Sequence, residues 1–336
     1  EVTCRDWSSD VCSSDLGKAP EIGPDQFALL EKLTNANAVS GDEYEVRQIV
    51  LDEIKLIADD VKVDAMGNVL ATKFGRGENR MRVMLASHMD EIGFMIVKKH
   101  DDGLFEFERV GGIDERQLPG KAVLVGRDHL PGVIGAKPIH MTTHSEREKS
   151  IEVDSLRIDL GPEIGDKVKP GDWATFATRF EILGPSIRAK ALDDRLGVAT
   201  LIELLKHAPD NIDLLLAFTV QEEVGLRGAR VAAYQFDPDM AIAVDSTPAN
   251  DLPNWDKDVE NSRYNTRLDA GPAIYVMDGA TIGDQRLIHL LADTAEENGI
   301  PYQIRQPGPG GTDAGVIHKV RRSEEHTSEL QSRQVI

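Results

Sequence analysis

The feature that most constrains the fold is a short apolar run that ends in two adjacent acids. Residues 214–220 read LLLAFTV, and Glu222 and Glu223 follow after one glutamine. A run this short and this apolar is typical of a buried parallel strand. Two carboxylates where the strand leaves the sheet are costly unless a cation receives them. We expect one glutamate to hold a metal ion and the other to transfer a proton.

Other predicted elements bring polar side chains to the same edge of the sheet. These are His88 and Asp90 after a strand at 81–86, Asp245 after a strand at 240–244, and Asp193 and Asp194 before a helix at 193–208. In open parallel sheets the ligand crevice lies beyond the carboxyl ends of the strands. The sequence therefore delivers one imidazole and several carboxylates to one crevice.

Such a crowd of anions is unfavourable by mutual repulsion. Two divalent metal ions, bridged by one carboxylate, would remove that repulsion. Imidazole and carboxylate ligands suit zinc or cobalt, with manganese as a further candidate.

Each signal also has a plainer structural interpretation. A histidine at a strand end is often a hydrogen-bonded structural residue, and a Glu-Glu pair is often a solvated face. Asp194 before a helix can be only an N-cap. Asp90 favours the metal interpretation of His88, because a carboxylate can accept the imidazole N–H and fix the ring. The repeated placement of these residues at strand ends favours a common site.

The remaining pattern predicts an α/β fold with an all-β insert. Residues 24–34 and 281–299 have helical spacing, and Ser40 with Glu43 matches a capping box that opens another helix. From Gly93 to about residue 185, short alternating runs are broken by glycine and proline, which is typical of a small barrel or sandwich.

The two ends differ from the rest of the chain. Residues 6–16 and 322–332 have no apolar periodicity, and one sequencing adapter read on both strands would encode both peptides. We therefore set residues 1–16 and 321–336 aside as adapter-like tails, the alternative being natural disordered tails. Both cysteines, Cys4 and Cys12, fall in the first tail, so the remainder offers neither disulfides nor thiol catalysis.

Charge and hydropathy exclude several partners. The formal net charge is −20, with 58 acids against 38 bases, which argues against nucleic acid or an anionic membrane surface as a partner. No apolar run approaches the roughly 20 residues of a membrane span. With no visible signal peptide, we expect a cytoplasmic protein.

Several ordered motifs together resemble the glutamyl or tetrahedral aminopeptidases, dinuclear metallopeptidases of which some members were once labelled endoglucanase or cellulase. The motifs are SHMDEIG at 87–93, AKALDDR at 189–195, QEEVG at 221–225, AVD at 243–245 and GTDA at 311–314. The resemblance covers about residues 20–320. It implies a three-layer α/β/α catalytic domain with a mixed sheet, formed by residues 17–92 and 186–320. It also implies that residues 93–185 form an inserted β domain for oligomerisation, often into a tetrahedral dodecamer.

The resemblance also implies roles for single residues. His88, Asp193 and Asp245 would hold one metal ion, with Asp193 bridging to a second ion held by Glu223. Glu222 would be the general base, and Asp90 would orient His88. The implied activity is removal of N-terminal residues from peptide substrates.

One departure from the family concerns the end of the chain. The family has a further histidine ligand of the second metal near its C-terminus, whereas here the match ends near Val320. His318 is too close to the GTDA loop, and His326 belongs to the tail set aside. We therefore expect a weakened second metal site, an uncovered sheet edge or core face, and a chain that is poorly active or prone to aggregation.

Other functions remain open at this point. A deacylase or carboxypeptidase could use the same metal scaffold, and a glycosidase would use two carboxylates without metal. In a non-enzymatic protein the acids would bind a structural cation. The preferred N-terminal residue of the substrate cannot be inferred from the sequence.

Overall fold

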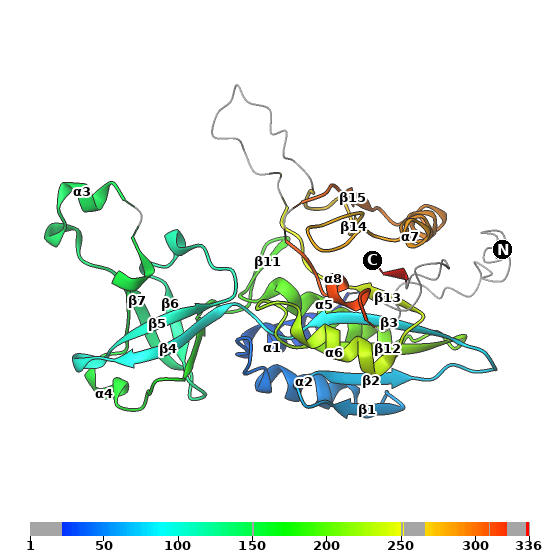
Figure 1. Ribbon diagram of the computed structural model, residues 1–336, viewed down its shortest axis with the longest axis horizontal. Helices are drawn as coiled ribbons and strands as arrows, with labels where there is room; N and C mark the ends of the chain where they lie inside the picture. The colour runs from blue at the N-terminus through cyan, green and yellow to red at the C-terminus, as the bar shows by residue number, and fades with distance from the viewer. Residues whose placement is uncertain are drawn as a thin grey trace, which may run out of the picture.

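The computed structural model describes residues 22–149, 151–249, 251, 266–308, 310–320 and 334–335. The first tail set aside above, and residues 321–333 and 336 of the second, lie outside these ranges. The described chain forms a sheet with helices on both faces, a β-barrel beside it and a smaller unit above the sheet (Figure 1).

The central sheet has six strands in the order β1-β2-β12-β3-β13-β16. Their bounds are β1 (Asp60–Val63), β2 (Val69–Lys73), β3 (Met81–His88), β12 (Ile212–Thr219), β13 (Met240–Ala243) and β16 (Gln334–Val335). The run 214–220 lies in and just after β12, which pairs parallel with β3 and antiparallel with β2. The sheet is therefore mixed. Thr219 pairs with His88, so the carboxyl ends of β12 and β3 lie side by side.

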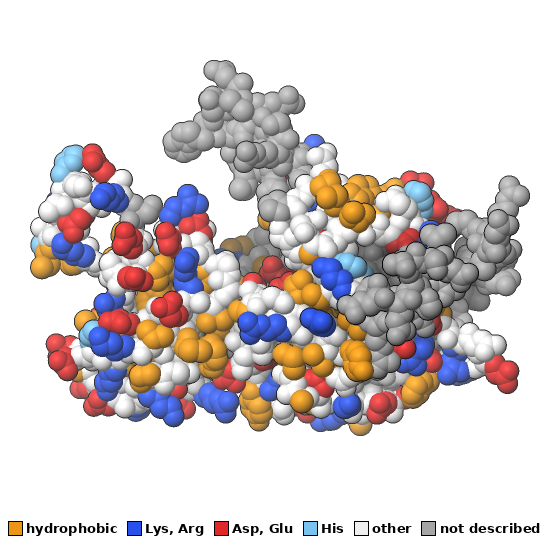
Figure 2. Space-filling model, viewed as in Figure 1, with side chains coloured by type: hydrophobic (Ala, Val, Ile, Leu, Met, Phe, Trp, Pro, Cys, Tyr) orange, Lys and Arg blue, Asp and Glu red, His pale blue; other side chains and the backbone are white. Residues whose placement is uncertain are grey.

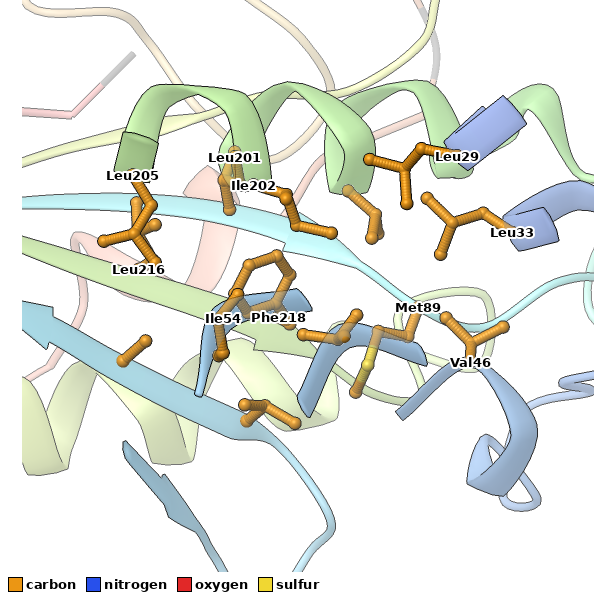
Figure 3. Packing of buried hydrophobic residues seen from close by; sticks show 14 of the residues in the cluster. Leu29, Leu33, Val46, Ile54, Met89, Leu201, Ile202, Leu205, Leu216 and Phe218 are labelled. Atoms are coloured by element: carbon orange, nitrogen blue, oxygen red, sulfur yellow. The ribbon is translucent and has the colours of Figure 1, made fainter. Parts of the chain in front are cut away.

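Helices cover both faces of the sheet, which confirms the predicted three layers. The helices α1 (Pro24–Asn35), α2 (Tyr44–Ile54) and α5 (Leu192–Lys206) pack on one face, and α6 (Arg227–Phe236) and α8 (Ala314–Ile317) pack on the other. Side chains of β12 alternate between the faces. Leu216 and Phe218 point towards Ile54, Leu201 and Leu205 (Figure 3), whereas Leu215 and Ala217 pack with the alanines of α6. Among the described residues, no helix is long and apolar enough to span a membrane.

The insert is a closed antiparallel barrel, as the alternating pattern predicts. Its strand order is β4-β5-β8-β7-β6-β9. The bounds are β4 (Gly93–Lys99), β5 (Leu104–Val110), β6 (Ala122–Val125), β7 (Leu130–Gly135), β8 (Arg157–Asp159) and β9 (Trp173–Phe176). Phe94 fills the interior and meets Phe107 and Phe176 edge-to-face, with ring centroids 5.1 and 5.2 Å away.

Short elements complete the barrel region. They are the helices α3 (His144–Arg147) and α4 (Pro162–Gly165), the 3-10 turns Asp101–Gly103, Glu115–Gln117, Ile139–Met141 and Val153–Ser155, and the hairpin of β10 (Glu181–Leu183) and β11 (Ser186–Arg188). The hairpin lies where the chain returns from the barrel to the sheet (Figure 1).

The smaller unit consists of two parallel strands and one helix. These are β14 (Ala273–Tyr275), β15 (Gln303–Arg305) and α7 (Gln285–Glu297). A cavity of about 670 Å³ separates the unit from β13 and α5, with Ile242, Val244 and Ile274 among its apolar lining. At the edge of the sheet, β16 pairs with Met240 and Ala241 of β13. The two residues of β16 belong to the second of the tails set aside above.

Two predicted helix starts are wrong. The capping box at Ser40 and Glu43 does not form, because Ser40 donates its hydroxyl to Asp90 and the Glu43 carboxylate accepts the Gly41 amide. The helix expected from residue 281 begins at Gln285 instead, capped by Asp284. At Ser40, the hydrogen bond to Asp90, which is distant in the sequence, replaces the local bond of the capping box.

Candidate active site

The strand-end residues meet in one pocket of about 210 Å³ above the sheet. His88 comes from the end of β3, Glu222 and Glu223 from the turn after β12, Asp245 from just beyond β13, and Asp193 from the start of α5; all five line the pocket. Asp90 is fully buried beneath them, with 0% exposure. Of the residues that the sequence assigned to a common site, the structure therefore brings together all but Asp194.

His88, Asp193 and Asp245 form a group that could hold a metal ion. One candidate ligand atom from each lies within 4.8 Å of the others. Nε2 of His88 is 3.1 Å from Oδ1 of Asp193 and 3.9 Å from Oδ1 of Asp245. Nδ1 of His88 donates to the backbone carbonyl of Asp90 at 3.1 Å. That bond leaves Nε2 of a neutral ring free as a ligand.

Burial and mutual repulsion dominate the electrostatics of the pocket. Burial raises the pKa of Glu222 to about 9, with His88 opposing the shift and Asp313 and Asp245 adding repulsion. Burial likewise raises the pKa of Glu223 and of Asp245 to about 7. For His88, burial lowers the pKa, but hydrogen bonds to Asp193 and Asp90 raise it well above its ordinary value. The pocket thus favours any cation that can offset its negative charge.

Asp90 organises the pocket from below. Its carboxylate accepts the backbone N–H of Glu222 at 3.0 Å and that of Glu223 at 3.2 Å. The Ser40 hydroxyl donates to the same carboxylate at 2.5 Å. Its Oδ1 lies 3.5 Å from Nδ1 of His88, farther than the backbone carbonyl. Asp90 therefore positions the two glutamates as much as the imidazole.

The turn that carries the two glutamates is tightly constrained. Gln221 and Leu226 adopt left-handed conformations with φ of 56° and 57°. The Glu222 carbonyl accepts the N–H groups of Gly225 and Leu226, both at 2.9 Å. Left-handed residues other than glycine are disfavoured and persist where the surroundings hold them.

Asn68 holds the two ends of this turn together, a role that the sequence did not indicate. Its side-chain oxygen accepts the Val220 N–H at 3.0 Å, and its Nδ2 donates to the Gly228 carbonyl at 3.0 Å. A Cβ at Gly228 would lie 2.3 Å from the Asn68 oxygen, so the close approach requires glycine.

Asp194 does not line this pocket. Its Oδ1 accepts the Gly197 N–H at 3.1 Å, and its Oδ2 accepts the Ser87 hydroxyl at 2.5 Å. The geometry supports the N-cap interpretation of Asp194.

A buried ion cluster ties the backbone segments of the site together. Glu91 accepts from Lys190 at 2.7 Å and from Arg195 at 3.3 Å, and all three are buried. Arg195 also donates to the carbonyl of Met89 at 3.0 Å. The cluster therefore joins the segment after β3 to the segment around Asp193.

Further pocket residues were not expected from the sequence. Tyr275, Asp278 and Arg305 line the pocket, and Asp313 lies buried nearby, where its Oδ2 accepts the Thr219 hydroxyl at 2.6 Å. In the sequence, the GTDA motif indicated Asp313. The only indication for Arg305 was its position at the end of a strand before a glycine-rich loop. His140, His144 and His318 do not line the pocket.

Comparison with known proteins gives a consistent picture. Residues 67–328 match the model of the M42 glutamyl aminopeptidases. The chain is 38% identical over 300 residues to a putative aminopeptidase of Acetivibrio thermocellus, covering 88% of this chain and 86% of that protein. It is 32% identical over 305 residues to a lysyl aminopeptidase of Pyrococcus furiosus, covering 87% and 84%.

Solved structures agree with this match. An aminopeptidase from Desulfurococcus kamchatkensis superposes with a TM-score of 0.83 at 35% identity, covering 93% of this chain and 85% of that one. The TET1 peptidase of Pyrococcus horikoshii, which can assemble into a tetrahedron or a large octahedral shell, gives a TM-score of 0.73 at 36% identity, with 87% of each chain covered. The chain therefore belongs to the M42 family of glutamyl aminopeptidases.

Proposed function

We propose that this protein is a metal-dependent aminopeptidase that hydrolyses N-terminal residues from peptides. The observation that carries the proposal is the group of His88, Asp193 and Asp245 in the same pocket as Glu222 and Glu223. An imidazole and several carboxylates around one small space suit a divalent cation better than any other common group.

The residues present fit such a cation. His88, Asp193 and Asp245 would hold one ion, and Asp193 and Glu223 would hold a second. Zinc or cobalt is the proposed metal, with manganese as a further candidate. Bound divalent ions would lower the pKa of a water molecule and polarise the scissile carbonyl. Among the described residues, His88 is the one imidazole that lines the pocket, so we propose that the second ion binds more weakly.

Glu222 is the proposed general base. Its carboxylate takes a proton from the attacking water and returns it to the leaving amine as the peptide C–N bond breaks. Asp90 supports this role because it holds the Glu222 backbone and faces His88. The acidic pocket attracts the cationic α-amino group of a peptide, which would favour cleavage at the N-terminus.

The test combines metal analysis with a panel of substrates. Chelated protein is expected to lose hydrolysis of aminoacyl-p-nitroanilides and to regain it when zinc, cobalt or manganese is added. Chelator-resistant activity on a cellulose-type substrate would identify a glycosidase instead. Preferential cleavage of N-acylated amino acids or of C-terminal residues would identify a deacylase or a carboxypeptidase. Metal binding without any hydrolysis would indicate a structural cation.

We also propose that the chain forms a homo-oligomer, by analogy with the TET1 peptidase. The proposed domains are residues 17–92 with 186–320 for catalysis and 93–185 for assembly. In support, hydrophobic side chains are exposed on the barrel face in Figure 2, and Ile139 and Met141 are 71% and 61% exposed. Light scattering during gel filtration measures the assembly, for which a dodecamer is expected. The cytoplasmic location stays a prediction.

A further inference from the structure

The barrel comes close to the pocket at the turn that follows β5. Val110, the last residue of β5, pairs with Gly93 at the start of β4, and Gly111 begins the turn. A Cβ on Gly111 would lie 3.3 Å from Cβ of Glu223 and 2.6 Å from Cγ2 of Ile92. Gly111 therefore packs against the stem of a proposed metal ligand, with no room for a side chain between them.

Glycine is required at position 111 for two independent reasons. Its φ of 86° lies in the left-handed region, which side chains disfavour, and the contacts with Glu223 and Ile92 leave no space for a Cβ. Gly120, in the same barrel region, has a similar φ of 81°. Among the described residues other than its two chain neighbours, none has a heavy atom within 4 Å of a Cβ at Gly120. The close approach to Glu223 is thus a feature of Gly111 and not of left-handed glycines in general.

The turn that carries Gly111 is held in place by the barrel. Nη1 of Arg109 donates to the carbonyl of Ile113 at 2.8 Å and closes the turn. Ile113 is buried and belongs to the barrel core. The turn therefore cannot move away from Glu223 without disturbing that core.

Side-chain contacts hold the barrel against the helix layer of the sheet. Nε2 of His129 lies 2.6 Å from Oε1 of Glu45 in α2. The Thr175 hydroxyl donates to Oδ1 of Asn37, in the segment before α2, at 3.1 Å. Because these contacts fix the barrel on the helix layer, they also fix the position of its turn relative to Glu223.

The Glu223 side chain has few other contacts that could orient it. Its backbone N–H donates to Asp90 at 3.2 Å, but its carboxylate makes no hydrogen bond or ion pair with another described residue. The packing contact of Gly111 at Cβ of Glu223 therefore contributes to the direction of the side chain.

We propose that Gly111 is a positioning residue, through which the barrel directs Glu223 towards the second divalent ion. Metal–ligand distances tolerate deviations of only about 0.2 Å, so a shift of a few tenths of an ångström in Glu223 would weaken this site. The inference rests on the proposed metal centre, and it gives the barrel a part in the active site besides assembly. The first ion, proposed to bind His88, Asp193 and Asp245, should not depend on this turn.

The binding test compares Gly111→Ala with Gly120→Ala, which adds the same methyl group at a similar φ without the contact. Calorimetric titration of the metal-free proteins with zinc measures the two binding steps. In Gly111→Ala the weaker step should lose about 10- to 100-fold in affinity, as is typical when a metal ligand is no longer oriented, and the tighter step should change less than about threefold. Gly120→Ala should bind both ions as the wild type does.

Crystal structures of the metal-free variants supply a measurement that does not depend on metal binding. In Gly111→Ala, Cβ of Glu223 should move by about 0.3 Å, because carbon atoms pack at about 3.5–4.0 Å and the added Cβ would lie at 3.3 Å. Gly120→Ala should leave Glu223 in place. An unmoved Glu223 in Gly111→Ala would overturn the inference. An equal loss of both binding steps would also overturn it and make Gly111 a purely structural residue.

A second pair of variants loosens the turn without adding a methyl group to it. Arg109→Met removes the bond to the Ile113 carbonyl. Arg116→Met, on the same loop, removes an exposed guanidinium that pairs with Asp114. Arg109→Met should lower the affinity of the weaker step about threefold or more, and Arg116→Met should leave it unchanged. If Gly111→Ala does not fold, equal affinities of these two variants would overturn the inference.

Activity distinguishes this inference from the proposed function. A wild type that binds two ions, with the weaker step dependent on Gly111, but hydrolyses no aminoacyl-p-nitroanilide contradicts the aminopeptidase proposal alone. A wild type that hydrolyses these substrates with only one bound ion contradicts the second ion and, with it, the role of Gly111, but not the aminopeptidase proposal.

Discussion

The backbone N–H of Glu222 donates to the carboxylate of Asp90 across 3.0 Å, joining segments that lie 132 positions apart in the sequence. The proposed base is therefore held through its main chain by an acid at the end of another strand. Asp90 faces His88 as well, so one buried carboxylate fixes the proposed base and a proposed metal ligand together.

Asp90→Asn should impair catalysis more than folding. The amide replaces one acceptor oxygen by a donor, so it cannot accept from both glutamate N–H groups and from Ser40 as the carboxylate does. We expect kcat to fall about 10- to 100-fold, the range typical when a residue that orients a metal ligand is lost. Steady-state kinetics with circular dichroism as the folding control tests this. Unchanged kcat in a folded variant would mean that Asp90 has no positioning role.

Glu222→Gln should separate proton transfer from metal binding. Glutamine keeps the shape of the side chain but cannot accept and return a proton, so kcat should fall about 100- to 10,000-fold. Metal content should stay at the wild-type level, because Glu222 is not among the proposed ligands. Glu223→Gln is the matched comparison, since it should lose bound metal as well as activity. If the two variants lost metal equally, the separate roles proposed for the two glutamates would be wrong.

The metal-free protein should become less stable as pH rises from about 5 to 9. The folded pKa values of Glu222, Glu223, Asp245 and Asp313 are raised to about 9, 7, 7 and 6. Above about pH 4.5 the unfolded state releases these protons, whereas the folded state keeps them up to its higher pKa values. The free energy of unfolding therefore falls as the pH rises through this range. The melting temperature of chelated protein, measured against pH, should decline through this window.

The gain in melting temperature on adding a divalent ion should grow over the same window, because the ion replaces the lost protons. Glu222→Gln provides the control. It removes the group with the highest of the four pKa values, so the decline between pH 7 and 9 should flatten. A melting temperature that rises with pH in the chelated wild type would show that the acids are not crowded as described.

The residues of the site could be predicted from the sequence where each lies at the end of its own strand. Each strand ends in its own polar residue, and parallel strands bring those ends to one edge, so His88, Glu222, Glu223 and Asp245 could be grouped from sequence. The barrel was predictable for a similar reason, since alternation and turn residues are local.

Contacts between distant segments could not be predicted in this way. Ser40 looked like a helix cap because Glu43 follows at the right spacing, but its hydroxyl bonds to Asp90, 50 positions away. No local pattern singles out Asn68, which bonds to Val220, 152 positions away. Arg305 belongs to the pocket only because β15 pairs with β14 above the sheet. Such partners depend on the assembled fold, which local patterns do not encode.

Gly228→Ala should destabilise the fold at the turn that carries the proposed base. The added Cβ would lie 2.3 Å from the Asn68 side-chain oxygen and 2.4 Å from the Val220 carbonyl oxygen. The second neighbour is backbone and cannot rotate away, so we expect a loss of about 1–3 kcal/mol in the free energy of unfolding. Chemical denaturation measures this loss.

Gly112→Ala is the matched control for this change. Among the described residues other than its two chain neighbours, none has a heavy atom within 4 Å of a Cβ at Gly112. The same added methyl group should therefore leave stability within about 0.5 kcal/mol of the wild type. Because Asn68 fixes Val220, the displacement in Gly228→Ala should also reach Glu222 and lower kcat. Equal stability of the two variants would show that the contact between Asn68 and the turn is looser than the 3.0 Å bonds indicate.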